Sequence, residues 1–416
     1  METSELINSS SNLQKTNNNR FKFSKLKNKF TKILKKKSNE IINDKNNQKP
    51  INTLRNPGIE LVRILAMFAI ITNHIISHGN IFSKYKRYNF NLYFILILCS
   101  WHVSIFALIS GIVGYKSNKY SNLLYLWFCV FFYSITIPFF IKKFIKNLII
   151  KDPPLYDFFP VIYDNNWYFS KYFGMYLFLP VINRGIAYLS KGELLFLVIS
   201  TIGVFNIYND IMLPKKDTFL TNRGYSVLSL LIFYLAGAYI GKYKIEFLGI
   251  KKKLLYLICI FTYIFVSLLT RKMIFYNIGT VKGIFFPIVF LLKRTFVVKL
   301  DSLPMILQAI SIIFLLTNIN YNKYITKIIN FFGPLTFGVY LIHENKLVIF
   351  NITEKIFDND PNDLPLKSIY KLLFCKCFKV YCICFFIEYF RNLLFSFCKI
   401  KKMCVLIETK ICNLFG

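Results

Sequence analysis

Ionisable side chains interrupt the first long apolar segment of this chain. Glu60 and Arg63 lie three residues apart, about one helical turn, so their side chains can pair. His74 follows Arg63 by eleven residues, close to three turns, which places both side chains on one helix face about 16 Å apart along the axis. His78 extends that face by one more turn. Because an ionisable group at mid-membrane costs about 2.5–3.5 kcal/mol on insertion scales, this face is a candidate functional site.

The face suits the transfer of a group from a phosphate-bearing donor to a hydroxyl. A guanidinium at the membrane rim, Arg63, can hold the phosphates of a donor that comes from the cytoplasm. An imidazole deeper in the membrane, His74, can take the proton of a hydroxyl near neutral pH. One alternative remains open, namely a structural Glu60–Arg63 ion pair with histidines that only bond neighbouring helices.

The other two histidines also lie in apolar segments. His102 stands near the middle of the second segment, and His343 ends the run that starts at Gly333. All four histidines of the chain therefore lie in or beside apolar segments, and none lies in the polar N-terminal region. Four such placements favour a polar cavity, although for His102 alone a bond between helices is an equally good explanation.

The apolar segments that carry these residues are long enough to cross a bilayer. With 55% hydrophobic residues in 416, the composition excludes a soluble enzyme, a disulfide-stapled secreted domain and a disordered scaffold. We predict an all-α polytopic membrane protein, a bundle of about ten transmembrane helices with a polar central cavity. The predicted spans are about 60–78, 92–114, 121–141, 168–183, 192–208, 226–242, 253–270, 303–319, 333–352 and 371–396, with a re-entrant or interfacial piece at 283–292.

The formal charge of +33 lies mainly in the N-terminal region and in short loops. Such loops offer no continuous groove for a phosphate backbone, so we expect a lipid bilayer and no nucleic acid as partner. The positive-inside rule places both termini in the cytoplasm and leaves the choice of plasma membrane or endomembrane open. We predict a basic, mostly disordered tail over 1–55, a transmembrane domain over 56–396 and a short cytoplasmic tail over 397–416. Residues 21–37 are either an amphipathic membrane-surface helix or solvated tail.

Ten cysteines do not indicate a disulfide framework, because several lie inside an apolar segment. Cys375, Cys377, Cys382 and Cys384 are expected to be buried thiols, and no metal site is predicted. Three further cysteines lie near the membrane exit and are candidates for S-acylation: Cys398, Cys404 and Cys412.

Five stretches, in matching order, resemble motifs of the acyltransferase-3 family, integral-membrane enzymes that acylate, usually acetylate, sugars of surface glycans. The most specific stretch is Asn56 to Arg63 with ten residues before His74, which resembles the family's Arg-x10-His motif. The resemblance extends to about Phe395. The other stretches are Phe106 to Gly111, Asn166 to Asn183, Tyr340 to His343, and Ile387 to Arg391 with its Glu-x-x-Arg.

The sequence departs from the family at the start of the third predicted span. Relatives usually carry a pair of arginines there, whereas this chain has Lys116 and Lys119. Lysine attracts a phosphate as a point charge, but it lacks the bidentate fork of arginine.

The resemblance implies an O-acyltransferase that moves an acyl group, usually acetyl, from cytoplasmic acyl-CoA to a hydroxyl of a sugar or glycan at the outer or lumenal side. Acetyl-CoA is the expected donor substrate, near Arg63, Lys116 and Lys119, and no permanently bound cofactor is expected. The expected catalytic residues are His74, Arg63 and Glu60. Whether His74 acts as a general base or carries the acyl group is left open.

The resemblance also suggests residues for the acceptor. His78, His102, Asn166, Trp167 and His343 are the candidates for binding the sugar. For Asn166 and Trp167, packing in the aromatic belt at the membrane surface explains their position equally well. The Glu388–Arg391 motif near the inner rim is expected to be a structural pair, with a functional role as the alternative.

Two other functions compete with acyl transfer. A transporter or flippase of lipid-linked sugars would also need a polar cavity, but such proteins usually show internal repeats, and we find none in this sequence. A structural membrane scaffold would leave the Arg63–His74 face unexplained. Acyl transfer is therefore the preferred hypothesis, and protein partners are not predicted.

Overall fold

The computed structural model describes residues 55–144, 161, 166–212, 217–243, 251–276, 286–295 and 299–415. These residues belong to one compact unit that begins at Arg55. All regular structure within the described ranges is helical. The all-α prediction is therefore confirmed, and the amphipathic helix predicted at 21–37 lies outside the described residues.

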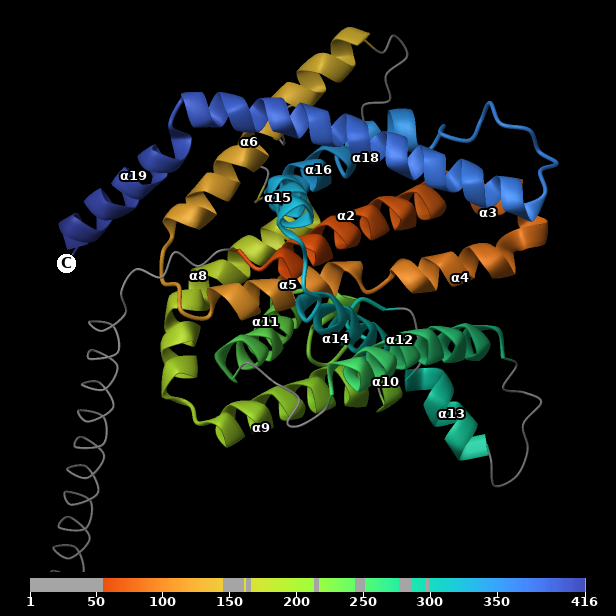
Figure 1. The fold of residues 1–416 in the computed structure, drawn as a ribbon, viewed down its shortest axis with the longest axis horizontal. Helices are drawn as coiled ribbons and strands as arrows, with labels where there is room; N and C mark the ends of the chain where they lie inside the picture. Colours follow the sequence, from red (N-terminus) through yellow and green to blue (C-terminus); the bar gives the residue numbers. More distant parts are fainter. Residues whose placement is uncertain are drawn as a thin grey trace, which may run out of the picture. The chain divides into compact units, whose positions relative to one another are not determined.

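The described helices run in chain order from α2 to α19 (Figure 1). Their bounds are α2 (Pro57–His78), α3 (Ile81–Lys84), η1 (Lys86–Tyr88), α4 (Asn89–Cys99), α5 (His102–Gly114), α6 (Ser121–Phe144), α8 (Trp167–Tyr188), α9 (Lys191–Thr201), η2 (Ile202–Tyr208), α10 (Asn209–Met212), η3 (Asn222–Gly224), α11 (Val227–Tyr243), α12 (Lys252–Phe275), α13 (Phe286–Thr295), α14 (Leu303–Thr317), α15 (Lys323–Phe332), η6 (Gly333–Leu335), α16 (Thr336–His343), α17 (Lys346–Val348), η7 (Ile349–Thr353), α18 (Leu366–Phe397) and α19 (Ile400–Phe415).

Six helical segments among the described residues are long and apolar enough to cross a membrane. They are Pro57–His78, Lys86–Gly114, Ser121–Phe144, Lys191–Tyr208, Lys253–Phe275 and Lys323–His343, and two shorter apolar helices are Val227–Tyr243 and Leu303–Thr317. The remaining predicted spans, 168–183 and 371–396, lie in α8 and α18, which are not among these helices. The protein is thus a multi-pass membrane protein, and the count of ten spans stays a prediction.

Helix α2 begins where the sequence gives a strong start signal. The Asn56 side chain accepts a hydrogen bond of 2.8 Å from the Gly58 backbone N–H, and Pro57 occupies the first turn, where no N–H is needed. Glu60 lies in the same turn, where a carboxylate also interacts favourably with the helix dipole. The helix then continues without a break to His78, so the Arg63–His74 spacing expected from the sequence is kept.

Helix α2 is the central element of the described unit. It contacts α4, α5, α14, α15, α16 and α18, which come from both halves of the chain (Figure 1). The second predicted span is broken at Ser100 and Trp101, so α4 and α5 are separate helices and His102 is the first residue of α5. Both of these helices contact α2.

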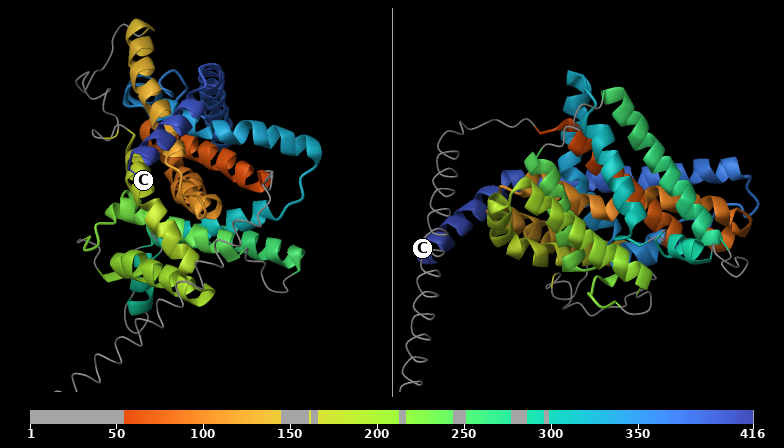
Figure 2. Two further views of the ribbon diagram at one scale, coloured as in Figure 1. Left: turned by 90° about the vertical axis from the view of Figure 1, so that its left-hand side faces the viewer. Right: turned by 90° about the horizontal axis from the view of Figure 1, so that it is seen from below.

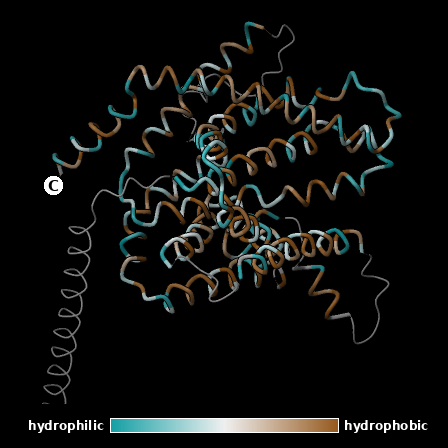
Figure 3. Tube along the Cα trace, in the orientation of Figure 1, coloured by the Kyte–Doolittle hydropathy of each residue, from teal (hydrophilic) through white to brown (hydrophobic). Residues whose placement is uncertain are grey.

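Several helices are apolar along most of their length (Figure 3), and some of their apolar side chains are exposed on an outward face. Large side chains there remain exposed within the protein, including Val181 at 72%, Phe196 at 74%, Phe261 at 66% and Phe390 at 66%. Exposed apolar surface of this extent matches contact with lipid. Between these faces, the core clusters are built around α2 and its neighbours.

The predicted C-terminal tail contains a further helix, α19, which turns away from α18 at Cys398 and Lys399 (Figures 1 and 2). The Glu408 carboxylate accepts hydrogen bonds from the backbone N–H groups of Tyr120 and Ser121, at 2.5 and 3.0 Å. Partial burial raises the pKa of Glu408, but these hydrogen bonds to its charged form hold the pKa below its ordinary value. The end of the chain is thereby attached to the start of α6.

All ten cysteines have free thiols. Cys377 and Cys384 are buried on α18, as expected, whereas Cys375 is exposed. Of the S-acylation candidates, Cys398 and Cys412 are exposed, whereas Cys404 is fully buried. The Cys404 thiol is therefore not accessible to an acylating enzyme in this structure.

Candidate active site

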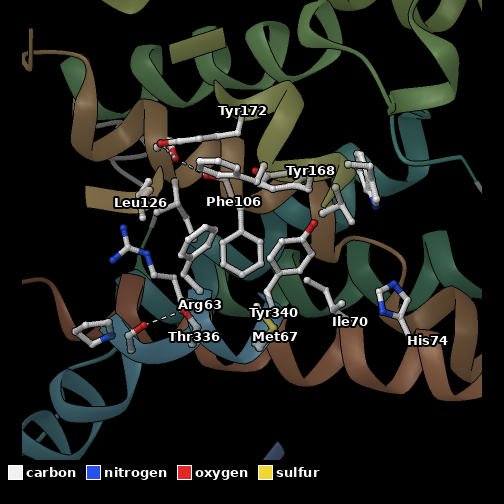
Figure 4. A pocket seen from close by; sticks show the side chains of 18 residues that line it. Arg63, Met67, Ile70, His74, Phe106, Leu126, Tyr168, Tyr172, Thr336 and Tyr340 are labelled. Carbon is white, nitrogen blue, oxygen red and sulfur yellow. Dashed lines mark hydrogen bonds between the residues drawn. The ribbon is translucent and has the colours of Figure 1, made fainter. Parts of the chain in front are cut away.

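A cavity of about 220 Å³ lies along α2 (Figure 4). Arg63 and His74 stand at opposite ends of its lining, with Met67 and Ile70 between them on the same helix. Helices α5, α6, α8, η6 and α16 supply the remaining walls. The lining residues are Arg63, Met67, Ile70, His74, Val103, Phe106, Ile109, Ser110, Leu126, Trp167, Tyr168, Phe169, Tyr172, Gly333, Pro334, Thr336, Phe337 and Tyr340.

Arg63 is held at its end of the cavity by Glu60. The Arg63 Nη1 atom lies 2.7 Å from Glu60 Oε1, and the two side chains are 24% and 4% exposed. Glu60 does not line the cavity, so it contacts the guanidinium on the side that faces away from the cavity. A guanidinium carries five N–H groups in a planar fork, which leaves donors to face an anion in the cavity.

His74 is paired with a carboxylate that the sequence analysis did not select. Its Nδ1 atom lies 2.7 Å from Glu344 Oε2, and the two side chains are 20% and 11% exposed. A carboxylate at Nδ1 favours the tautomer that carries its proton there and leaves the Nε2 lone pair available. The only hint in the sequence was that Glu344 directly follows His343.

Two further histidine rings lie beside the His74 ring. The His78 and His343 rings lie 5.7 and 5.4 Å from the His74 ring between centroids. His78 is exposed at the end of α2, whereas His343 is buried at the end of α16. His74, His343 and Glu344 each offer a metal-ligand atom within 4.8 Å of the other two. The structure thus brings three of the predicted histidines together.

The middle of the cavity is apolar and aromatic. Met67, Ile70, Phe106, Phe169 and Phe337 occupy most of the wall between the two ends. The prediction of a polar central cavity is therefore not confirmed. The reason is the spacing along α2, because the residues one and two turns beyond Arg63 on its cavity face are Met67 and Ile70.

Two hydroxyls add polar groups beside the apolar wall. The Ser110 and Tyr172 oxygens lie 3.3 Å apart, and the Ser110 hydroxyl also donates to the Phe106 carbonyl at 2.8 Å. Tyr172 was not among the selected site residues. Its position on α8 follows from the packing of α8 against α5 rather than from any local motif.

His102 lies outside the cavity lining and makes a bond between helices. Its Nε2 atom lies 3.0 Å from the Asn73 side-chain nitrogen, an amide donor on α2, and the His102 side chain is buried. This contact supports the structural explanation that the sequence had left open for His102.

The remaining acceptor candidates lie at the start of α8. Asn166 is buried and flanks the first turn of the helix. Trp167 lines the cavity, and its ring packs on Tyr225 with centroids 4.4 Å apart. Trp167 therefore remains a candidate for contact with a substrate, while Asn166 is buried in the protein.

Lys116 and Lys119 are exposed in the connection between α5 and α6. Neither of them lines the cavity that holds Arg63. The Lys116 ammonium lies 5.6 Å from the centre of the Tyr115 ring. The structure does not bring these lysines together with Arg63 in one pocket, so a shared contact with the donor is not visible in this conformation.

The Glu388–Arg391 motif forms a buried hydrogen-bonded network, and neither residue lines the cavity. Arg391 Nη2 and Nε donate to the Glu388 carboxylate, and the Tyr133 hydroxyl donates to Glu388 Oε2 at 2.7 Å. Arg391 Nη1 donates to the Tyr125 hydroxyl at 3.1 Å. The Glu388 and Arg391 side chains are only 2% and 4% exposed. This network matches the structural pair expected from the sequence.

A family model described as an acyltransferase domain, that of the acyltransferase-3 family, matches residues 56–387, which is more than half of the chain. No curated protein and no solved structure matches the sequence. The matched region begins at the cap of α2 and ends within α18, so it contains both ends of the cavity.

Proposed function

The chain belongs to the acyltransferase-3 family, and from that premise we propose that it transfers an acyl group from acyl-CoA to a hydroxyl of a sugar or glycan. The family makes it a multi-pass membrane acyltransferase. The observation that carries the finer proposal is the pairing of His74 with Glu344 at the end of the cavity opposite Arg63. Acetyl-CoA is the proposed donor.

The donor end of the proposal rests on Arg63. Its guanidinium faces the cavity with one nitrogen held by Glu60, so the remaining donors can bind a phosphate of CoA. The apolar wall beyond it suits the pantetheine arm and a short acyl chain, because neither carries a charge. The acyl carbonyl would then approach His74 at the far end, about 16 Å along the helix axis from Arg63.

The chemical step uses the free nitrogen of His74. Nε2 takes the proton of the acceptor hydroxyl as its oxygen forms a bond to the acyl carbonyl carbon. The carbon–sulfur bond of the thioester then breaks, and the CoA thiolate takes up the proton from His74. Glu344 beside Nδ1 stabilises the imidazolium that forms in between. We propose direct transfer, without an acyl-histidine intermediate.

The sidedness of the reaction is part of the proposal. The basic N-terminal region supports a cytoplasmic N-terminus, and with about ten spans the C-terminus lies on the same side. The Arg63 end of α2 then lies towards the cytoplasm and the His74 end towards the outer or lumenal side. The acceptor sugar would then approach from the side of His78 and Trp167. Family membership gives no support to the transporter alternative.

The experiment uses the purified full chain in lipid nanodiscs with acetyl-CoA that is radiolabelled in the acetyl group. We expect label to appear in an added sugar or glycan, and a His74→Gln variant to lose this transfer. Protein incubated without acceptor tests direct transfer, since an acyl-histidine would retain label after rapid quenching. Binding of acetyl-CoA without transfer to any hydroxyl acceptor would contradict the proposed function.

A further inference from the structure

We propose that His74, His343 and Glu344 form a binding site for a divalent transition-metal ion of the Zn²⁺ class, and that the bound ion reversibly inhibits acyl transfer. The site departs from the sequence-based expectation of no metal, which was argued from the cysteines. Its inhibitory effect rests on the proposed function, whereas the binding itself does not.

The first observation is the proximity of three ligand groups. One ligand atom from each of His74, His343 and Glu344 lies within 4.8 Å of the other two. In a tetrahedral zinc site with ligand bonds of about 2.0–2.1 Å, neighbouring ligand atoms are about 3.3 Å apart. The His74 Nδ1 to Glu344 Oε2 distance of 2.7 Å therefore has to open slightly, and the wider gaps have to close.

The second observation is a buried nitrogen without a partner. His343 Nδ1 lies 2.7 Å from the Val339 carbonyl oxygen, which can only accept, so Nδ1 carries the proton of the neutral ring. Its Nε2 atom therefore presents a lone pair. That atom is buried and has no hydrogen-bond partner among the described residues, and His343 is only 4% exposed. The Nδ1–H···O=C bond is the outer contact that commonly orients a metal-binding histidine.

The ligand set points to the class of ion. Two imidazole nitrogens and one carboxylate oxygen are the protein ligands of one type of open zinc site, which leaves the fourth position for water or substrate. Magnesium and calcium prefer oxygen ligands, so a site with two imidazoles disfavours them. Of the three ligand residues, His74 lines the cavity, and His343 and Glu344 lie beside it.

The inhibitory effect follows from the tautomer of His74. The proposed reaction needs the proton on Nδ1, beside Glu344, and the lone pair on Nε2. An ion that binds Nδ1 needs the lone pair of that nitrogen and therefore displaces its proton. In the neutral ring the proton is then carried by Nε2. Nε2 can then no longer accept the proton of the acceptor hydroxyl. Removal of the ion restores the first tautomer, which makes the inhibition reversible.

The test is a Co²⁺ titration of the purified full chain, prepared without a histidine tag and stripped with a chelator. We expect one Co²⁺ per chain, the visible absorption of a tetrahedral nitrogen and oxygen site, and displacement by Zn²⁺. His343→Gln should weaken binding by about 100-fold or more, because even loss of an outer-shell contact costs about 10–100-fold. The matched control is His102→Gln, which removes a buried histidine outside the ligand group and should bind Co²⁺ as the parent does.

Three results would overturn the site: no Co²⁺ binding by the parent protein, unchanged binding by His343→Gln, or a thiolate-to-cobalt charge-transfer band, which would place the ion on cysteines. If the variants do not fold, X-ray absorption of the Zn²⁺-loaded parent decides, since sulfur ligands lie at about 2.3 Å and nitrogen ligands at about 2.0–2.1 Å.

A separate assay tests the inhibition. In parent protein that transfers acetyl groups, Zn²⁺ should stop turnover and a chelator should restore it. Bound metal with unchanged turnover would refute the inhibitory effect and leave the site standing. A protein that binds Co²⁺ at these residues but transfers no acetyl group would refute the proposed function alone.

Discussion

Two Glu-x-x-Arg pairs lie on helices of this protein, and their surroundings differ. Glu60 and Arg63 stand at the start of α2, with Arg63 24% exposed in the wall of the cavity. Glu388 and Arg391 stand in α18, where Tyr125 and Tyr133 complete the hydrogen bonds and Arg391 is 4% exposed.

One short segment of the chain packs against both pairs. Gly333 lies against the Glu60 carboxylate and Gly338 against the Glu388 carboxylate, so closely that a Cβ atom at either glycine would collide with the glutamate. Both glutamates are therefore fixed in the same way. The arginines are not, since Arg391 also bonds to Tyr125 whereas Arg63 faces open space. The same motif thus joins α18 to α6 by hydrogen bonds at Glu388 and Arg391, whereas at Glu60 and Arg63 it presents a guanidinium to the cavity.

The comparison gives four predictions, beginning with the largest expected effect. His74→Ala should lower turnover by about two to four orders of magnitude, the usual scale for a lost general base. Acetyl-CoA binding should change little, because Arg63 lies three turns away. Steady-state kinetics with a parallel binding assay checks both parts. Transfer at the parent rate would show that the cavity end with His74 has no catalytic role.

The second prediction concerns the buried Glu388–Arg391 pair. Arg391→Met should destabilise the protein by about 3–5 kcal/mol, because it leaves the Glu388 charge buried without a partner. The matched control combines it with Glu388→Gln, which removes both charges and should recover most of the loss. Unfolding in detergent measures the difference. If the single variant is as stable as the parent, the network does not hold α18 to α6.

The third prediction concerns Arg63. Arg63→Ala should weaken acetyl-CoA binding by roughly 10–100-fold, the range for hydrogen bonds to a charged group. Arg63→Lys keeps a cation beside Glu60 but loses the fork, so its affinity should lie between those of the parent and the alanine variant. Equal affinities for all three proteins would mean that this pair is structural, like the one in α18.

The fourth prediction concerns two hydroxyl deletions that form a matched pair. Tyr133→Phe removes a donor from the buried Glu388 carboxylate and should cost about 1.5–3 kcal/mol of unfolding free energy. Tyr172→Phe removes a cavity hydroxyl 3.3 Å from Ser110 and should cost about 1 kcal/mol or less. Thermal unfolding of both variants measures the two losses of stability. A larger loss in Tyr172→Phe than in Tyr133→Phe would contradict the distinction between the buried Glu388 network and the open cavity.

The sequence predicted the local geometry of α2 correctly. Helical periodicity alone puts Arg63 and His74 on one face, and Asn56 and Pro57 mark where the helix starts, so both features could be derived before any tertiary contact was known. The ionisable groups in apolar segments marked the candidate site for the same reason. The family motifs along 56–395 added the class of reaction, in agreement with the match over 56–387.

Other parts of the site depended on how the helices pack. Glu344 comes from a segment 270 residues beyond His74, and nothing in the local pattern indicates that the two side chains meet. The exposed positions of Lys116 and Lys119 and the start of a new helix at His102 were likewise not indicated by the apolar pattern of the sequence.

The sequence by itself therefore determined the membrane-helix class, the cation and imidazole on one face of α2, and the family. Only the tertiary structure decided which of the two Glu-x-x-Arg pairs opens to the cavity, and which carboxylate supports His74. The physical reason is that helix periodicity is a property of neighbouring residues, whereas burial and pairing depend on segments that meet only when the helices pack.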